Sequence, residues 1–419
     1  MRSIAVARHF STAFNAPKTP IDRDNNRCDG GARRAVKGLV RITGCILFLW
    51  LAAFQAQAAF TSLYVFGDTV STTTNNQNGG SIYYGNRYSN GRVWVELLAQ
   101  ELNLTNNYWY SNSPANRLSY TNLSASSVNW SYAGNDLSYF DHDSGDLVAE
   151  MANFAAPPDA SNALFIVWVN DADLYDAIYL HDDGTDPAKW SNDIVQSMTN
   201  HWAVITNLHA KGVRTLLMPN AVDMSRIPAF DTDAETNFIS QECTNYDLAF
   251  DAMLNNARVS FPDLKIYEPD YFSLLDNMLA NPSAYGVTNA LENGRSIDAL
   301  DDPALSDYSL NGPGSSYIFW DYLDPTARVH AILADMAKQL LAPARVSELA
   351  PAGAGYRLDL ADVPVGLNGI VLGSTNLAPA NWMPATNFIS ANDTLSVFVP
   401  AAGPLHFYRL EFPLAWTWP

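Results

Sequence analysis

Four short and nearly continuous apolar runs constrain most strongly how this chain can fold. They are Leu63–Phe66, Leu164–Val169, Val213–Met218 and Leu264–Tyr267. Apolar runs without alternating polar residues are typical of strands that are buried on both faces. Longer amphipathic stretches separate and follow them, namely Arg92–Leu102, Asn192–Lys211, Ile239–Val259 and Thr326–Leu341. Strands separated by helices of this length need crossover connections, so the sequence predicts a three-layer α/β/α fold with a parallel sheet.

The sequence changes in character after residue 342. Glycine, proline and short alternating runs such as Tyr356–Leu360, Leu395–Val399 and Phe407–Leu410 predict a small all-β domain. We therefore expect three parts, which are a presequence at 1–59, an α/β domain at 60–342 and a β-rich C-terminal domain at 343–419.

The presequence has the organisation of a secretory signal peptide. Basic residues between Arg33 and Arg41 precede an apolar run, Ile46–Phe54, and small residues up to Ala58 follow it. The apolar run is shorter than the roughly 18 residues that a membrane-spanning helix needs, so we expect no integral membrane span. The mature protein is then expected in the periplasm, at the cell surface or outside the cell.

Charge and cysteine content exclude some functions. The formal net charge is −19, although the first 59 residues contain nine of the 24 lysines and arginines. So acidic a chain repels nucleic acid and anionic membranes, and we expect no nucleic-acid partner. Cys28 and Cys45 would leave with the presequence, which leaves Cys243 and no intrachain disulfide.

Two segments are candidates for catalysis. Val65–Thr69 is an apolar strand that ends in Gly-Asp-Thr, and a nucleophile at the carboxyl end of a parallel strand lies where open α/β sheets form their active sites. Gly-Asp-Thr also suits an ordinary turn. The second segment, Tyr317–Thr326, contains Asp321 and Asp324. Asp324 equally suits a helix N-cap, with Pro325 at the first helical position.

Together with three further segments, these two resemble the GDSL (SGNH) ester hydrolases, in particular the bacterial lipase and haemolysin-like branch. Five of that family's elements occur here in the family's order. The matching segments are Phe66–Thr69, Ser89–Trp94, Asn129–Gly134, Trp168–Leu174 and Phe319–Thr326, and Asn281–Asn289 is similar to a segment common in that branch. The resemblance implies a flavodoxin-like strand order and an ester hydrolase without a cofactor or metal ion. It also implies a small ester, a lipid or an acylated carbohydrate as substrate.

The resemblance further implies a serine nucleophile and a histidine base that is oriented by an aspartate three residues earlier. This chain has Thr69 at the position of the serine and Asp324 at that of the histidine, while Asp321 keeps the family's identity. The family's oxyanion hole combines a glycine N–H with an asparagine side chain. Gly134 matches the glycine, Ala172 stands at the asparagine position, and Asn170 is two residues away and offers an amide instead.

These substitutions predict weak or lost activity. The β-methyl group of threonine restricts χ1, and an aspartate with an ordinary pKa is a weaker base than a histidine. Loss of the nucleophile or base of a hydrolytic triad costs on the order of 10⁶ in turnover. A pair of carboxyls, Asp321 and Asp324, that shares a proton offers an alternative base.

Other readings stay open from the sequence. Together with Asp68, the pair offers oxygen ligands to a hard cation. His142 or His181 is a possible replacement base, whereas His330 falls on an apolar helical stretch and is expected to pack. A different class of function is a non-catalytic protein that binds carbohydrate or lipid in the same cleft, for which the abundant aromatic residues are suited.

Overall fold

The computed structural model describes most of the chain beyond the predicted presequence. The described residues are 60–72, 82–84, 87–102, 104, 128–129, 143–181, 184–231, 235–364, 368–377, 379–400 and 407–412. The predicted signal peptide, Gly134 and His142 lie outside the described residues. Among the described residues, no helix combines the length and apolar character that crossing a membrane requires.

A five-stranded sheet with the order β2-β1-β3-β4-β5 forms the centre of the α/β part, and all its neighbouring strands are parallel. Its strands are β1 (Leu63–Gly67), β2 (Val128–Asn129), β3 (Leu164–Trp168), β4 (Thr215–Leu217) and β5 (Lys265–Tyr267). This is the flavodoxin-like order, so the predicted fold class is confirmed. Every residue of β1, β3 and β4 is buried, as continuous apolar runs require. β5 differs because it is an edge strand, and Lys265 is exposed there.

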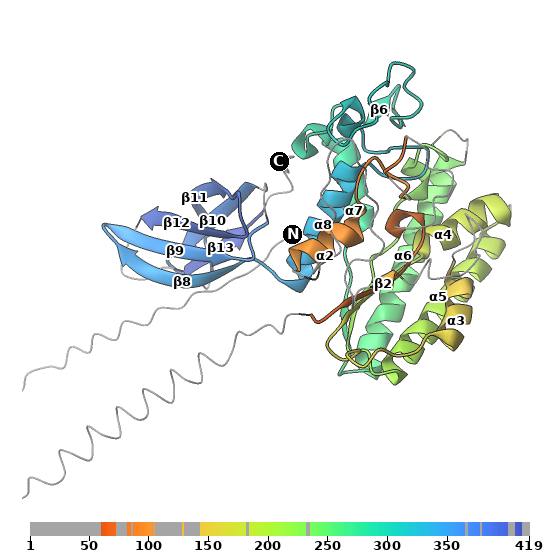
Figure 1. Ribbon diagram of the computed structural model, residues 1–419, viewed down its shortest axis with the longest axis horizontal. Helices are drawn as coiled ribbons and strands as arrows, with labels where there is room; N and C mark the ends of the chain where they lie inside the picture. Colours follow the sequence, from red (N-terminus) through yellow and green to blue (C-terminus); the bar gives the residue numbers. More distant parts are fainter. Residues whose placement is uncertain are drawn as a thin grey trace, which may run out of the picture. The chain divides into compact units, whose positions relative to one another are not determined.

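Helices cover both faces of this sheet. They are α2 (Trp94–Glu101), α3 (Ser144–Asn153), α4 (Asn170–Tyr175), α5 (Pro187–Ala210), α6 (Thr236–Ser260), α7 (Tyr271–Ala280) and α8 (Ala327–Leu341). α2 packs against α8 and α3 against α5, and Figure 1 shows these two pairs on opposite sides of the sheet. α4 continues directly into a π-helical turn, η2 (Asp176–Leu180). Short 3-10 helices are η1 (Thr69–Ser71), η3 (Met224–Arg226), η4 (Pro282–Tyr285) and η5 (Pro313–Ser316), and β6 (Leu291–Glu292) pairs with β7 (Arg295–Ser296).

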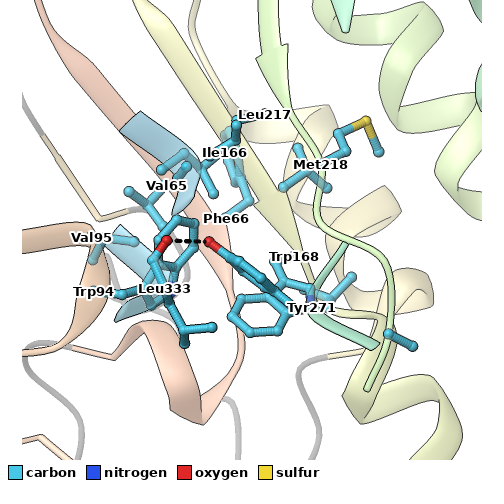
Figure 2. Packing of buried hydrophobic residues seen from close by; sticks show 14 of the residues in the cluster. Val65, Phe66, Trp94, Val95, Ile166, Trp168, Leu217, Met218, Tyr271 and Leu333 are labelled. Carbon is cyan, nitrogen blue, oxygen red and sulfur yellow. Dashed lines mark hydrogen bonds between the residues drawn. The ribbon is translucent and has the colours of Figure 1, made fainter. Parts of the chain in front are cut away.

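The core under the carboxyl ends of β1 and β3 is aromatic. The ring centroids of Trp94 and Trp168 lie 5.5 Å apart, and that of Tyr271 lies 5.0 Å from Trp168. Tyr271 also donates a hydrogen bond of 2.8 Å to the carbonyl oxygen of Leu333 in α8, the dashed line in Figure 2. Three helices are thereby tied to the sheet end where the candidate residues lie.

In the described part of the chain after residue 344, the regular secondary structure is all β, as predicted. It forms two three-stranded antiparallel sheets, with the orders β12-β9-β8 and β11-β10-β13. The strands are β8 (Arg345–Ala352), β9 (Gly355–Ala361), β10 (Asn368–Ser374), β11 (Met383–Ile389), β12 (Thr394–Pro400) and β13 (Phe407–Glu411). They share a hydrophobic cluster of their own, which includes Leu358, Val371 and Tyr408.

Candidate active site

Thr69 lies in the turn at the carboxyl end of β1. Just after the last residue of β1, the backbone N–H of Asp68 donates to the carbonyl oxygen of Trp168. The side chain of Asp68 then begins the turn, because its Oδ1 accepts the N–H of Val70 over 3.1 Å. This caps η1, the short helix that begins at Thr69. Gly67 is required just before the turn, because a Cβ there would lie 2.6 Å from the Cβ of Ser71. The Gly-Asp-Thr sequence is therefore a turn, and the turn holds Thr69 at the strand end.

A tight loop carries the two candidate acids. The backbone N–H of Trp320 donates to the carbonyl oxygen of Asp324 over 2.7 Å. Within the loop, Oδ1 of Asp321 accepts the backbone N–H groups of Leu323 and Asp324 over 2.9 and 2.8 Å. Asp321 therefore organises the turn that presents Asp324.

The structure brings Thr69, Asp321 and Asp324 together. The hydroxyl group of Thr69 donates a hydrogen bond to the carboxylate of Asp324, and the negative charges of Asp321 and Asp68 act on the same carboxylate. All three aspartates are buried. The carboxyl end of β1 thus has a hydroxyl group and a pair of buried acids close to one another.

Asp324 has the stronger tendency of the two acids to hold a proton. Burial raises the pKa of Asp324 well above its ordinary range, and the charge of Asp321 adds to this effect. Its Oδ1 has no hydrogen-bond partner among the described residues. Burial also raises the pKa of Asp321, but hydrogen bonds from two backbone N–H groups and from the hydroxyl group of Tyr83 oppose that rise.

Asp324 does not cap α8, in contrast to the alternative reading of its sequence context. The residue that precedes the helix is Thr326, and it makes no side-chain cap hydrogen bond. Instead, Oδ1 of Asn90 accepts the backbone N–H of Ala327 over 2.9 Å. A distant asparagine thus fulfils the capping role, and the carboxylate of Asp324 interacts with Thr69.

The Ser89–Trp94 segment joins α2 to α8. The backbone N–H of Trp94 donates to Nδ1 of His330 over 3.2 Å. Arg87 and Glu96 form an ion pair with both side chains fully buried. Any Cβ at Gly91 would lie 2.5 Å from that of Ala327. The segment therefore fixes the start of α8, which directly follows the loop that bears Asp324.

Asn170, the proposed oxyanion residue, is the first residue of α4 and is fully buried. Its Nδ2 donates to the carbonyl oxygen of Pro219 over 3.2 Å, so one of its two amide hydrogens is engaged by the loop after β4. Asp171, the next residue, accepts the N–H of Val222 over 3.0 Å, and burial raises its pKa to about 7. The charge of Asp171 in turn raises the pKa of Asp68, which places the start of α4 beside the Thr69 turn.

Among the described histidines considered from the sequence, His330 and His181 contact groups other than Thr69 and the two acids. His330 is fully buried, and burial lowers its pKa to about 3, so it packs as a neutral ring, as expected. His181 is half exposed, and its Nδ1 lies 3.2 Å from Oδ2 of Asp193 on α5. The alternative of a metal site also finds no support, because no group of three or more potential ligands is arranged to hold an ion among the described residues.

Two contributors to the site have no clear signal in the sequence. Tyr83 donates its hydroxyl hydrogen to Oδ2 of Asp321 over 2.7 Å. Asp171 lies in Trp168–Leu174, where the resemblance concerns only the oxyanion asparagine, its counterpart Ala172 and the nearby Asn170. For Tyr83, the one available signal was its place in the polar stretch between Thr72 and Arg87, which reads as a surface loop of the kind that often faces substrate.

Comparisons with known proteins show which proteins this chain is similar to. Residues 63–337 match the model of the GDSL-like lipase/acylhydrolase family. One GDSL esterase/lipase of Arabidopsis thaliana is 22% identical, over 66% of this chain and 85% of its own length. A second GDSL esterase/lipase of the same plant is 25% identical, over 69% of this chain and 95% of its own length. A crystal structure of an α/β hydrolase enzyme from the metagenome of Lake Arreo in Spain is 14% identical, covers 68% of this chain and 97% of its own, and has a TM-score of 0.34.

Proposed function

Because the chain belongs to the GDSL-like lipase/acylhydrolase family, we propose that it hydrolyses ester bonds with Thr69 as nucleophile and Asp324 as general base. The observation that carries this proposal is the hydrogen bond from the Thr69 hydroxyl group to a buried carboxylate at the position where the family has its histidine. Small esters, lipids and acylated carbohydrates are the proposed substrates, and the proposed place of action is outside the cytoplasm, after removal of residues 1–59.

The raised pKa makes Asp324 a better base than an ordinary aspartate. A general base works best when its pKa lies near the working pH, and burial moves Asp324 in that direction. Its limits are equally clear, because an ionised carboxylate cannot become a cation that pairs with the developing oxyanion. The same rise in pKa keeps Asp324 protonated at low pH, so activity should increase with pH.

The proposed reaction follows a covalent path. Oγ1 of Thr69 attacks the ester carbonyl carbon, its proton passes to Asp324, and the alcohol leaves with that proton to give an acyl-threonine. Water then attacks the acyl group with Asp324 again as base, which regenerates the hydroxyl group. The backbone N–H of Gly134 and the amide of Asn170 are the proposed oxyanion donors, as in the resemblance. The β-methyl group of Thr69 limits its rotamers, so turnover should be slow.

A second candidate function is binding of a carbohydrate or lipid without catalysis. Tyr179, in the π-helical continuation of α4, is 63% exposed and stacks on Tyr175 with 5.3 Å between ring centroids. An exposed aromatic face of this kind suits the apolar face of a sugar ring or an acyl chain. In this alternative the Thr69 and Asp324 substitutions mark the loss of chemistry.

Hydrolysis of p-nitrophenyl acetate and butyrate between pH 6 and 10 distinguishes the two functions. The wild-type rate should exceed those of Thr69→Ala and Asp324→Asn and should rise with pH. Thr61→Ala is the matched control, because Thr61 precedes the opposite end of β1, where its hydroxyl group contacts Asp159. Equal rates for the wild type and Thr69→Ala would refute the hydrolase proposal and leave the binding function.

A further inference from the structure

Tyr83 reaches the pair of acids from a segment more than 200 residues away in the sequence. Its hydroxyl group donates to Oδ2 of Asp321 over 2.7 Å. The ring packs against a small apolar cluster that contains Trp320. The backbone beside it is also fixed, because the N–H of Tyr84 donates to the carbonyl oxygen of Ser89 over 2.8 Å. The hydroxyl group is thus held on one carboxylate oxygen.

The two acids differ in the hydrogen bonds that they accept. Oδ1 of Asp321 accepts two backbone N–H groups, and Oδ2 accepts the Tyr83 hydroxyl group. Asp324 accepts the hydroxyl group of Thr69, and its Oδ1 has no partner within the described part of the chain. Hydrogen bonds donated to a carboxylate stabilise its ionised form. Three donors therefore favour an ionised Asp321, and the proton that the two acids share is left to Asp324.

Other titratable groups around the pair cannot replace this stabilisation. Asp68 acts on Asp324, Asp298 on Asp321, and both are themselves acidic. Tyr88 and Tyr322 also interact electrostatically in this cluster, and neither carries a positive charge. Among the described groups named here, the donors to Asp321 are therefore the ones that stabilise its anion beside a second acid.

We propose that Tyr83 is a positioning residue of this acid pair, whose hydroxyl group keeps Asp321 ionised and oriented so that the shared proton is held and released by Asp324. The proposal rests on the proposed function, in which Asp324 is the base for Thr69. Tyr83 acts through Asp321 and does not touch the reacting atoms.

The variant Tyr83→Phe removes the hydroxyl donor while keeping the ring in its apolar cluster. Every form of the pair in which Asp321 is ionised then loses one hydrogen bond, whereas the form that has the proton on Asp321 loses none. The ionisation of Asp321 therefore moves to higher pH, and part of the shared proton passes from Asp324 to Asp321. A hydrogen bond to a charged group is strong enough to shift this ionisation upward by about one pH unit. Incorporation of 3-fluorotyrosine at position 83 makes the hydroxyl group a stronger donor and should move the ionisation in the opposite direction.

The matched control is Tyr317→Phe. Tyr317 belongs to the same apolar cluster and donates its hydroxyl hydrogen to Oδ2 of Asp302 over 2.8 Å. This variant therefore removes a tyrosine–aspartate hydrogen bond of nearly the same length from the same cluster, but away from the pair. Its effect on the pair's ionisation should be negligible.

The direct measurement is a pH titration by NMR of the full chain labelled with ¹³Cγ-aspartate, with the signals of the pair assigned from Asp321→Asn and Asp324→Asn. An upward shift in Tyr83→Phe but not in Tyr317→Phe supports the proposal. Unchanged ionisation of the pair in Tyr83→Phe and in the fluorotyrosine variant overturns it. This readout does not require turnover, so it separates a failure of the Tyr83 proposal from a failure of the hydrolase proposal.

If the protein hydrolyses esters, a kinetic readout follows. The acidic limb of the pH profile of kcat/KM follows the loss of the last proton from the pair, so in Tyr83→Phe it should move upward by no more than the shift of the Asp321 ionisation seen by NMR, with the rate at high pH retained. A lower rate at every pH without movement of the limb indicates a purely structural role and contradicts the proposal.

Discussion

Asp247 allows a quantitative test of how buried acids affect this protein. It lies on α6, and its Oδ1 accepts the backbone N–H of Ala221 over 3.0 Å in the loop after β4. Burial raises the pKa of Asp247 to about 8, and the negative charge of Asp171 contributes to the rise. The same loop is bound by Asn170 and Asp171 of α4, so Asp247 supports the backbone behind the candidate site.

The sign and size of the effect follow from proton linkage. The folded protein keeps a proton on Asp247 up to a pH of about 8, whereas the unfolded chain loses it near the ordinary value of 3.8. The free energy of unfolding therefore falls as the pH rises through this window. A shift of about four units, at about 1.4 kcal/mol each, amounts to about 6 kcal/mol.

The variant Asp247→Asn keeps an oxygen acceptor for the N–H of Ala221 but has no proton to lose. Relative to the wild type, we expect it to be more stable by about 2 kcal/mol at pH 5 and by about 6 kcal/mol at pH 9. Urea unfolding at the two pH values measures both differences. Asp251→Asn is the control, because Asp251 lies one turn further along α6 with a side chain that is 58% exposed. A stability gain for Asp247→Asn that is the same at both pH values would contradict the raised pKa of Asp247 in the folded protein.

Three further predictions concern the site and its support. Asn90→Ala removes the cap on the N–H of Ala327 and should lower the free energy of unfolding by about 1 kcal/mol. Urea unfolding measures this difference, and an unchanged urea midpoint would contradict the capping role. Burial lowers the pKa of His330 to about 3, so the unfolded chain binds an extra proton between about pH 3 and 6.5 and stability falls on acidification. His330→Gln should flatten that fall by up to about 1.4 kcal/mol per pH unit, and an unaltered pH slope would contradict the buried neutral ring. Thr69→Ser combined with Asp324→His should raise esterase activity about tenfold or more over the wild type, a small part of the value of a complete triad; no gain would mean that the oxyanion side of the site is also lost.

The fold was predictable because local patterns determine it. The apolar runs at β1, β3 and β4 are buried on both faces in the structure, and no residue of these strands is exposed. The predicted start of α5 was five residues too late because the stretch before Asn192 is polar. There the helix begins instead with the side chain of Asp186 as cap and Pro187 in its first turn. α3, α4 and α7 were not predicted.

The site was only partly predictable. The convergence of Thr69 with Asp324 followed from the resemblance, which carries three-dimensional information that spacing lacks. The resemblance includes Asn90 within Ser89–Trp94 but gives it no role, and none of the matched segments contains Tyr83. Their hydrogen bonds to Ala327 and Asp321, each more than 200 positions away, were therefore not predicted. Local context even suggested Asp324 as a helix cap. That reading failed because a side chain from a distant segment already caps the helix.

Covalent labelling tests directly whether Thr69 is a nucleophile that Asp324 activates. A fluorophosphonate probe is incubated with the protein at pH 9, and the modified residue is located by mass spectrometry of its peptides. We expect an adduct on Thr69 in the wild type and in Thr61→Ala, and its loss in Thr69→Ala and Asp324→Asn. An adduct on another residue, or equal labelling of the wild type and Thr69→Ala, would contradict it.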